Sequence, residues 1–173
     1  MASGFYFVVL VCLTSGLWME ANAWKHEKKH EICCPCKSGW MVAGDRCVMF
    51  NFKKMSWANA ESSCISAGGN LASIHTEEEY TFIRDVVLQA TGQNATTWVG
   101  GYDAPEDGKW FWSDGKHFNF TYWGKNEPSN KDGKEHCMEI NFAGRNHVND
   151  QDCLDKNSFI CASRPNSYTD DCV

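Results

Sequence analysis

The cysteines limit the folds open to this chain more narrowly than any other residue type. Ten of them lie in 173 residues, and Cys12 belongs to a short apolar run over residues 5–13, upstream of Ala21 and Ala23. A run too short to span a bilayer, followed by small residues at alternate positions, is typical of a secretory signal peptide. We therefore expect residues 1–23 to be removed and the chain to be secreted. The nine later cysteines would then meet an oxidising compartment.

Nine cysteines cannot all pair within one chain. At least one must stay free or bond to another chain, and secretion favours the second outcome. The formal net charge of −6 argues against nucleic acid or an anionic membrane surface as a partner. No later apolar run approaches the roughly 20 residues of a membrane helix, so we expect no membrane insertion.

The mature chain has the length of one domain, which we place at residues 36–163. Residues 24–35 are rich in charge and predict an exposed N-terminal arm, which carries Cys33 and Cys34. Residues 164–173 form a C-terminal tail with Cys172.

Two helices are predicted in the first half of the domain. Ser56 is expected to cap the first, whose apolar positions at helical spacing are Trp57, Ala60, Cys64 and Ala67. Thr76 and Glu79 form the capping box of the second, and acids follow the cap directly. Its apolar face is expected to comprise Tyr80, Ile83, Val87 and Leu88.

Beyond Gly92 the pattern changes to strands, at residues 97–99, 110–112, 137–140 and 159–161. Residues 113–136 are rich in Gly, Asn, Asp and Lys and predict a long irregular loop. Long irregular loops in compact domains usually carry function.

Oxygen donors gather in and after this loop, close to Cys137 and Cys153. Carboxylates, a carboxamide and a hydroxyl suit a hard cation such as Ca²⁺, and a bound Ca²⁺ with open positions can hold a pair of sugar hydroxyls. The candidate sugar and calcium ligands are Glu127, Ser129, Glu135, Asn149 and Asp150. Trp123, also in the loop, is the candidate for stacking on a sugar ring. The tryptophans of the predicted strands, Trp98, Trp110 and Trp112, are expected in the core.

Several motifs, in order, resemble the C-type lectin-like domain. They are Cys36-x-x-Gly39-Trp40, Asn70-Leu71-Ala72-Ser73-Ile74-His75, Trp98-Val99-Gly100-Gly101, Trp110-Phe111-Trp112-Ser113-Asp114-Gly115, Glu127-Pro128-Ser129 and Asn149-Asp150-x-x-Cys153. The resemblance covers residues 36–161 and is strongest to soluble fish lectins, a branch shared with type II antifreeze proteins. It implies an α+β fold with two helices packed on small antiparallel sheets and a long irregular sugar and calcium loop. It also implies the disulfides Cys36–Cys47, Cys64–Cys161 and Cys137–Cys153.

The resemblance assigns sugar and calcium roles to Glu127, Glu135, Asn149 and Asp150, and a cis peptide bond before Pro128. Two positions depart from the family pattern. Ser129 stands where mannose-type members have Asn and galactose-type members Asp, and Val148 replaces a buried Trp. A hydroxyl is a shorter, neutral ligand, so calcium is expected to be weakly bound or dispensable.

These features predict a secreted, agglutinating lectin of mucosal or innate defence that binds microbial surface glycans, galactosides in preference to mannose. Two alternatives remain: an ice-binding protein of the antifreeze branch, and a protein-binding module with an inactive sugar site. The charged loop speaks against the flat, apolar face that ice binding requires. No catalytic motif occurs, so we expect no enzyme.

Cys33, Cys34 and Cys172 fall outside the implied disulfides and are the candidates for an interchain bond. Adjacent cysteines rarely reach disulfide geometry, so we expect a disulfide-linked homodimer. Asn94 and Asn119 lie in N-glycosylation sequons and are candidate glycan attachment sites.

Overall fold

The computed structural model describes residues 36–165. The predicted signal peptide (1–23), the arm (24–35) with Cys33 and Cys34, and most of the tail with Cys172 lie outside the described residues. The elements along the chain are β1 (Met41–Ala43), β2 (Arg46–Met55), α2 (Trp57–Ser66), β3 (Asn70–Leu71), α3 (Glu77–Thr91), β4 (Thr97–Tyr102), β5 (Phe111–Trp112), η1 (Lys131–Gly133), β6 (Glu135–Ile140), η2 (Phe142–Gly144), β7 (Val148–Asp152) and β8 (Asn157–Ser163).

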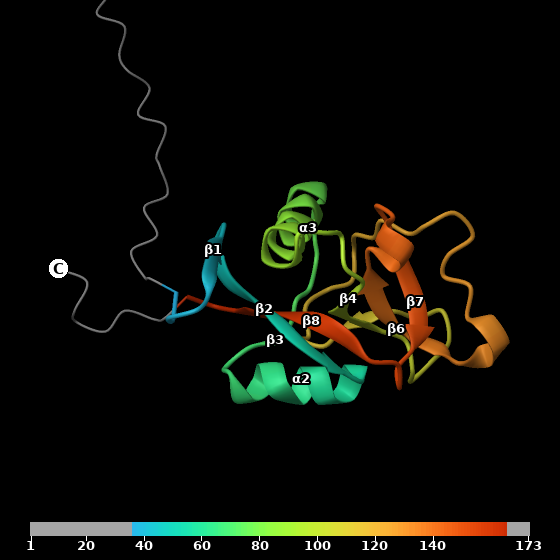
Figure 1. Cartoon of the computed structure of the whole chain (residues 1–173). Helices are drawn as coiled ribbons and strands as arrows, with labels where there is room; N and C mark the ends of the chain where they lie inside the picture. The colour runs from blue at the N-terminus through green and yellow to red at the C-terminus, as the bar shows by residue number, and fades with distance from the viewer. Residues whose placement is uncertain (1–35, 166–173) are drawn as a thin grey trace, which may run out of the picture. The chain divides into compact units, whose positions relative to one another are not determined.

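The strands of the described part form one connected sheet in the order β1-β2-β8-β4-β6-β7, with β3 beside β8 and β5 beside β4. The α+β fold is confirmed, but the sheet is mixed, because β4 runs parallel to β8 while its other pairings are antiparallel. Figure 1 shows α3 on one side of the β2–β8 ribbon and α2 on the other. No helix among residues 36–165 combines the length and apolarity needed to cross a membrane.

Helix α2 begins after Ser56, as predicted, although no side chain caps its N-terminus. The buried positions of α2 are Ala60 and Cys64, both on the expected face. Trp57 is half-buried, with its indole N–H donating to the Val99 carbonyl at 2.8 Å.

Helix α3 has the predicted cap. The hydroxyl of Thr76 accepts from the Glu79 backbone N–H at 3.2 Å. The Glu79 carboxylate, in turn, accepts from the His75 N–H and pairs with Arg46, each at 2.8 Å. The prediction for the apolar face was wrong at one position: Leu88 is 42 % exposed, and Val86 is buried in its place. α3 packs against β2, and its buried face includes Val87 but not Leu88, the next residue.

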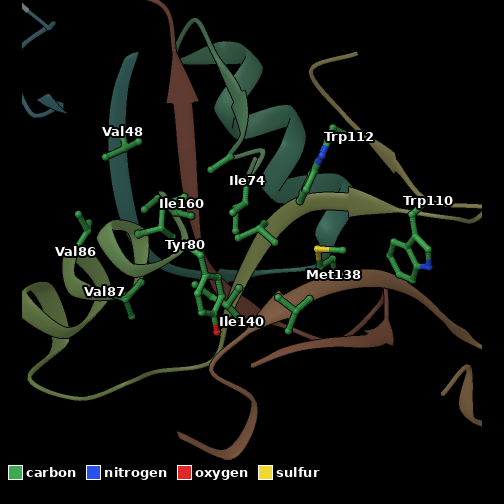
Figure 2. Packing of buried hydrophobic residues seen from close by; sticks show 14 residues of the cluster. Val48, Ile74, Tyr80, Val86, Val87, Trp110, Trp112, Met138, Ile140 and Ile160 are labelled. Carbon is green, nitrogen blue, oxygen red and sulfur yellow. The ribbon is translucent and has the colours of Figure 1, made fainter. Parts of the chain in front are cut away.

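Two groups of buried side chains form the core. One extends from Tyr80 of α3 past Met138 of β6 to Trp110 and Trp112, which lie away from α3 (Figure 2). The other lies between α2 and the sheet around Trp98, which is fully buried. Trp98, Trp110 and Trp112 are therefore core residues, as expected.

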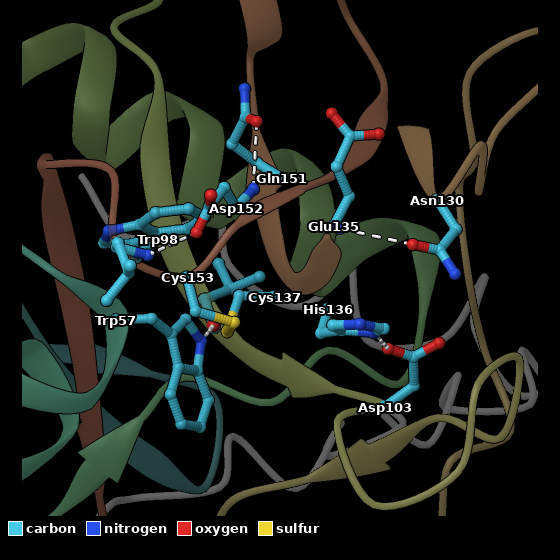
Figure 3. Close-up of a disulfide and its surroundings, with 12 residues drawn as sticks. Trp57, Trp98, Asp103, Asn130, Glu135, His136, Cys137, Gln151, Asp152 and Cys153 are labelled. Atoms are coloured by element: carbon cyan, nitrogen blue, oxygen red, sulfur yellow. Dashed lines mark hydrogen bonds and ion pairs between the residues drawn. A yellow bond between two sulfur atoms is a disulfide. The ribbon is translucent and has the colours of Figure 1, made fainter. Parts of the chain in front are cut away.

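The three disulfides implied by the resemblance are present. Cys36–Cys47 ties the start of the described chain to β2, and Cys64–Cys161 ties α2 to β8. Cys137–Cys153 joins β6 to the turn after β7 (Figure 3). The last bond therefore fixes the two strands that carry most of the candidate ligands.

Candidate functional site

The predicted long loop runs from the end of β5 to the start of β6 and has no regular structure except η1 and a single bridge between Trp123 and Val148. Its Glu127–Pro128 peptide bond is cis, as the resemblance implies. Asn126 and Asn130, on either side, have left-handed backbone angles that asparagine tolerates better than most residues. The loop thereby turns back toward β6 and β7.

Four of the five predicted ligands come together where the loop meets β6 and β7. Ser129 is central: its N–H donates to Asp150 Oδ1 and its hydroxyl to Glu135 Oε2, each at 2.9 Å. The N–H groups of Asn130 and Lys131 donate to the same two carboxylates, at 2.7 and 2.8 Å. The loop is thus held by backbone amides that bind acidic side chains of the sheet.

Glu127 completes this acidic cluster. One of its oxygens, Oε2, is buried and has no hydrogen-bond partner within residues 36–165. Burial, followed by the neighbouring Asp150 and Glu135 carboxylates, raises the pKa of Glu127, although the polar side chain of Ser129 opposes the shift. An unpaired carboxylate oxygen beside two other acids is the arrangement that a bound cation would stabilise.

The oxygen atoms gathered in this cluster therefore fit a hard cation such as Ca²⁺ as ligands. Glu127, Glu135 and Asp150 would supply carboxylate oxygens and Ser129 a hydroxyl oxygen. Both oxygens of Asp150 and one of Glu135 already accept hydrogen bonds from the loop, however. An entering ion would compete with those bonds.

Asn149, the fifth predicted ligand, points its amide group elsewhere. It is 4 % exposed, and its Nδ2 donates to Glu139 Oε1 at 3.1 Å and to the Asp150 carbonyl at 2.6 Å. Within residues 36–165 its side chain makes no hydrogen bond to Glu127, Ser129 or Glu135.

Glu139 is a buried acid that the sequence analysis missed. It is 1 % exposed and accepts from Asn149 and, through Oε2, from Asn157 Nδ2 at 2.7 Å. Burial raises the pKa of Glu139 to about 7, against the lowering effect of the two amide hydrogen bonds. The only sequence signal was its place between Met138 and Ile140 in a predicted strand.

A second set of polar side chains next to the loop was also missed. Asp103, Asp107 and His136 bring one possible ligand atom each within 4.8 Å of the others. His136 Nδ1 lies 3.0 Å from Asp103 Oδ1 (Figure 3), and the Asn130 side-chain amide donates to Asp107 Oδ1 at 2.7 Å. Glu135 and His136, neighbours in β6, thus contact different clusters. The position of His136 between Glu135 and Cys137 is the one signal that could have drawn attention to it.

The remaining candidates take separate places. Trp123 is half-buried, and its ring meets the edge of Trp110 with centroids 4.8 Å apart. The isolated bridge joins Trp123 to Val148, which is buried where the family pattern has Trp. Asn94 lies between α3 and β4 and Asn119 is exposed in the long loop; glycan attachment at both stays a prediction.

This chain has counterparts among known proteins. Residues 53–163 match the family model of the Lectin C-type domain. The galactose-specific lectin nattectin of Thalassophryne nattereri is 42% identical over 162 residues, covering 94% of this chain and 98% of that protein. The type-2 ice-structuring protein of Hemitripterus americanus is 35% identical over 127 residues, covering 73% and 74%. The solved herring type II antifreeze protein matches with a TM-score of 0.70 at 32% identity, over 76% of this chain and all of that one.

Proposed function

Because this chain belongs to the C-type lectin domain family, we propose that it is a carbohydrate-binding lectin whose sugar site is the cluster of Glu127, Ser129, Glu135 and Asp150. The observation that carries this proposal is the buried, unpaired Glu127 Oε2 beside two further carboxylates. Sugar hydroxyls donate readily to carboxylates, and such charge-assisted hydrogen bonds are stronger than neutral ones.

The preferred sugar is a galactoside. Ser129 replaces the Asn of mannose-type members, and its hydroxyl can both donate and accept. The relative nattectin is named galactose-specific, which supports the same preference. Trp123, held against Trp110, is the side chain we propose to stack on the sugar ring.

Calcium, in this proposal, is bound weakly or is dispensable. When bound, the ion would offer open coordination positions to sugar hydroxyls. Glu127, Glu135 and Asp150 would hold it, while Ser129 contributes a weaker neutral ligand. The loop amides that already bind Asp150 and Glu135 would have to yield, which lowers the affinity for the ion.

We further propose that the chain is secreted, forms a disulfide-linked dimer and agglutinates cells by binding microbial surface glycans. Two linked sites can raise avidity by roughly 10²–10⁴ without any new contact. Its chemistry is binding and not catalysis.

Ice binding is the second candidate, favoured by the similarity to type II antifreeze proteins. The exposed side chains of the loop oppose it, since they include Lys125, Lys131, Asp132 and Lys134. A protein-binding module with an inactive sugar site is the third. Thermal hysteresis of the purified protein tests the second, and absence of glycan binding with no hysteresis would favour the third.

The deciding experiment is a glycan array with the wild type and Glu127→Ala, with and without EDTA. We expect Glu127→Ala to lose glycan binding, because each charge-assisted hydrogen bond contributes roughly 1.5–3 kcal/mol. Glu77→Ala, which removes an exposed acid from α3, is the matched control and should bind as the wild type does. Unchanged binding by a folded Glu127→Ala would reject the site.

A further inference from the structure

We propose that Glu139 is a positioning residue that fixes the side-chain amide of Asn149, so that Asn149 offers its neighbours a carbonyl oxygen and no N–H. The consequence for sugar binding rests on the proposed function. The orientation itself rests only on contacts within the described residues.

The donors and acceptors of Asn149 account for this orientation. A carboxamide has two N–H hydrogens and one oxygen acceptor, whereas an ionised carboxylate only accepts. Nδ2 of Asn149 lies 3.1 Å from Glu139 Oε1 and 2.6 Å from the Asp150 carbonyl, which uses both hydrogens. Oδ1 is the one polar atom of this side chain left for another partner.

Glu139 is held as firmly as the side chain it orients. Its second oxygen accepts from the Asn157 amide at 2.7 Å, which anchors β6 to the first residue of β8. It lies on β6 opposite Asn149 on β7, and both residues are almost completely buried. Burial excludes solvent as a competing partner, so wherever Glu139 is ionised a flipped amide would place its oxygen against a carboxylate oxygen. The test is therefore run at pH 8, above the Glu139 pKa of about 7.

The orientation matters because the neighbouring groups are also acceptors. Glu127, Glu135 and Asp150 present carboxylates, and the Ser129 hydroxyl donates to Glu135. Asn149 precedes Asp150 on β7, and a ligand that reached its oxygen as well as these carboxylates would have to supply the hydrogens, as sugar hydroxyls do, or bring a shared cation. A flipped Asn149 would place a donor in the site and change the preference for the ligand.

Two variants separate positioning of Asn149 from general support of the fold. Glu139→Met removes both acceptors in a side chain of similar length. Asn157→Ala removes the other partner of Glu139 and leaves the Asn149 contact in place. The readout is the side-chain amide signal of Asn149 in a ¹H–¹⁵N NMR spectrum, assigned by its loss in Asn149→Ala.

We expect Glu139→Met to move the Asn149 amide signal toward that of a solvent-exposed asparagine and to weaken galactoside binding about tenfold, the loss of one buried hydrogen bond. Asn157→Ala should leave the Asn149 signal and galactoside binding unchanged.

If Glu139→Met does not fold, Glu139→Gln is the second variant. Its side chain has one acceptor oxygen for the amides of Asn149 and Asn157, so the signal of one of these two asparagines should shift. An unmoved Asn149 signal in folded Glu139→Met, or an equal shift in Asn157→Ala, would overturn the proposal. A wild type that binds no sugar but shows the Glu139-dependent signal would reject the proposed function alone.

Discussion

Ser129 joins the loop to the sheet through both its backbone and its side chain. Its N–H binds Asp150 on β7 and its hydroxyl binds Glu135 on β6. A longer asparagine at this position would reach further into the cluster and bring a stronger oxygen ligand for calcium. One residue type therefore decides whether the loop is held by its own hydrogen bonds or by an ion.

The calcium affinity should depend on whether Ser or Asn stands at position 129. We expect calorimetric titration of the wild type with CaCl₂ to give millimolar affinity or no signal, and Ser129→Asn to bind calcium more tightly. Ser129→Ala, which removes the oxygen, serves as the comparison in the opposite direction. Submicromolar affinity in the wild type would show that Ser129 does not impair the site.

The buried Glu139 predicts a pH-dependent stability. Its pKa is about 7 in the folded chain and near 4.5 without burial, so the folded chain keeps a proton that the unfolded chain has lost. The stability from this group is full below about pH 4.5 and is lost as the pH rises through 7, on the order of 3 kcal/mol. Urea unfolding in EDTA at pH 5 and pH 8 measures it. Glu139→Gln should lose less stability between these pH values; an equal loss would assign the effect to other groups.

Some residues of the candidate site could be predicted from their neighbours in the sequence, and others could not. That Glu127, Ser129, Glu135 and Asp150 lie together was predictable, because they flank cysteines and a proline in a fixed order. The burial of Glu139 was not, since it depends on β6 lying between β4 and β7, a long-range pairing that residue type does not reveal.

In helix α3, neighbouring residues determine the N-terminus, whereas packing against the sheet determines the buried face. Its N-terminus was predicted from Thr76 and Glu79, because the cap needs only neighbouring residues. Its buried face was predicted less well, since the packing of α3 on the sheet decides that Val86 is covered and Leu88 is not. Strand β2 was missed for a similar reason: Phe52 and the lysines after it are exposed, so no alternation marks it as a strand.

The cap of α3 gives a test at this level. Thr76→Ala removes the acceptor for the Glu79 N–H and should lower the free energy of unfolding by about 1 kcal/mol. Thr76→Ser keeps the hydroxyl and should stay close to the wild type in the same urea titration. If both variants lose equally, the threonine methyl group and not the cap supplies the stability.

The two described ends of the domain lie together. Cys36 is bonded to Cys47, and Cys47 pairs with Ser163 near the end of β8. Figure 1 shows these ends at the opposite side of the domain from the long loop between β5 and β6. Partner chains joined near these ends would leave the long loops of both chains, the proposed sugar sites, accessible. The pairing of the framework cysteines was implied by family resemblance alone, since spacing leaves many pairings open.

We therefore expect the mature protein to run as a dimer on a non-reducing gel and as a monomer after reduction. Cys33, Cys34 and Cys172 are the candidate interchain residues. A triple variant, with Cys33, Cys34 and Cys172 each replaced by Ser, should run as a monomer in both conditions and lose agglutination while keeping single-site sugar affinity. A wild type that runs as a monomer without reductant, with one titratable thiol per chain, would contradict the covalent dimer.

The disulfides also decide which part of the domain would bear a mechanical load. Tension between residues 36 and 165 would pass from Cys36 to Cys47, through β2 and α2 to Cys64, and across to Cys161. Residues 65–160 form a covalent loop off that path, and the sugar loop lies within it. Pulling on the two described ends would therefore stretch β2 and α2, while residues 65–160 stay under no tension.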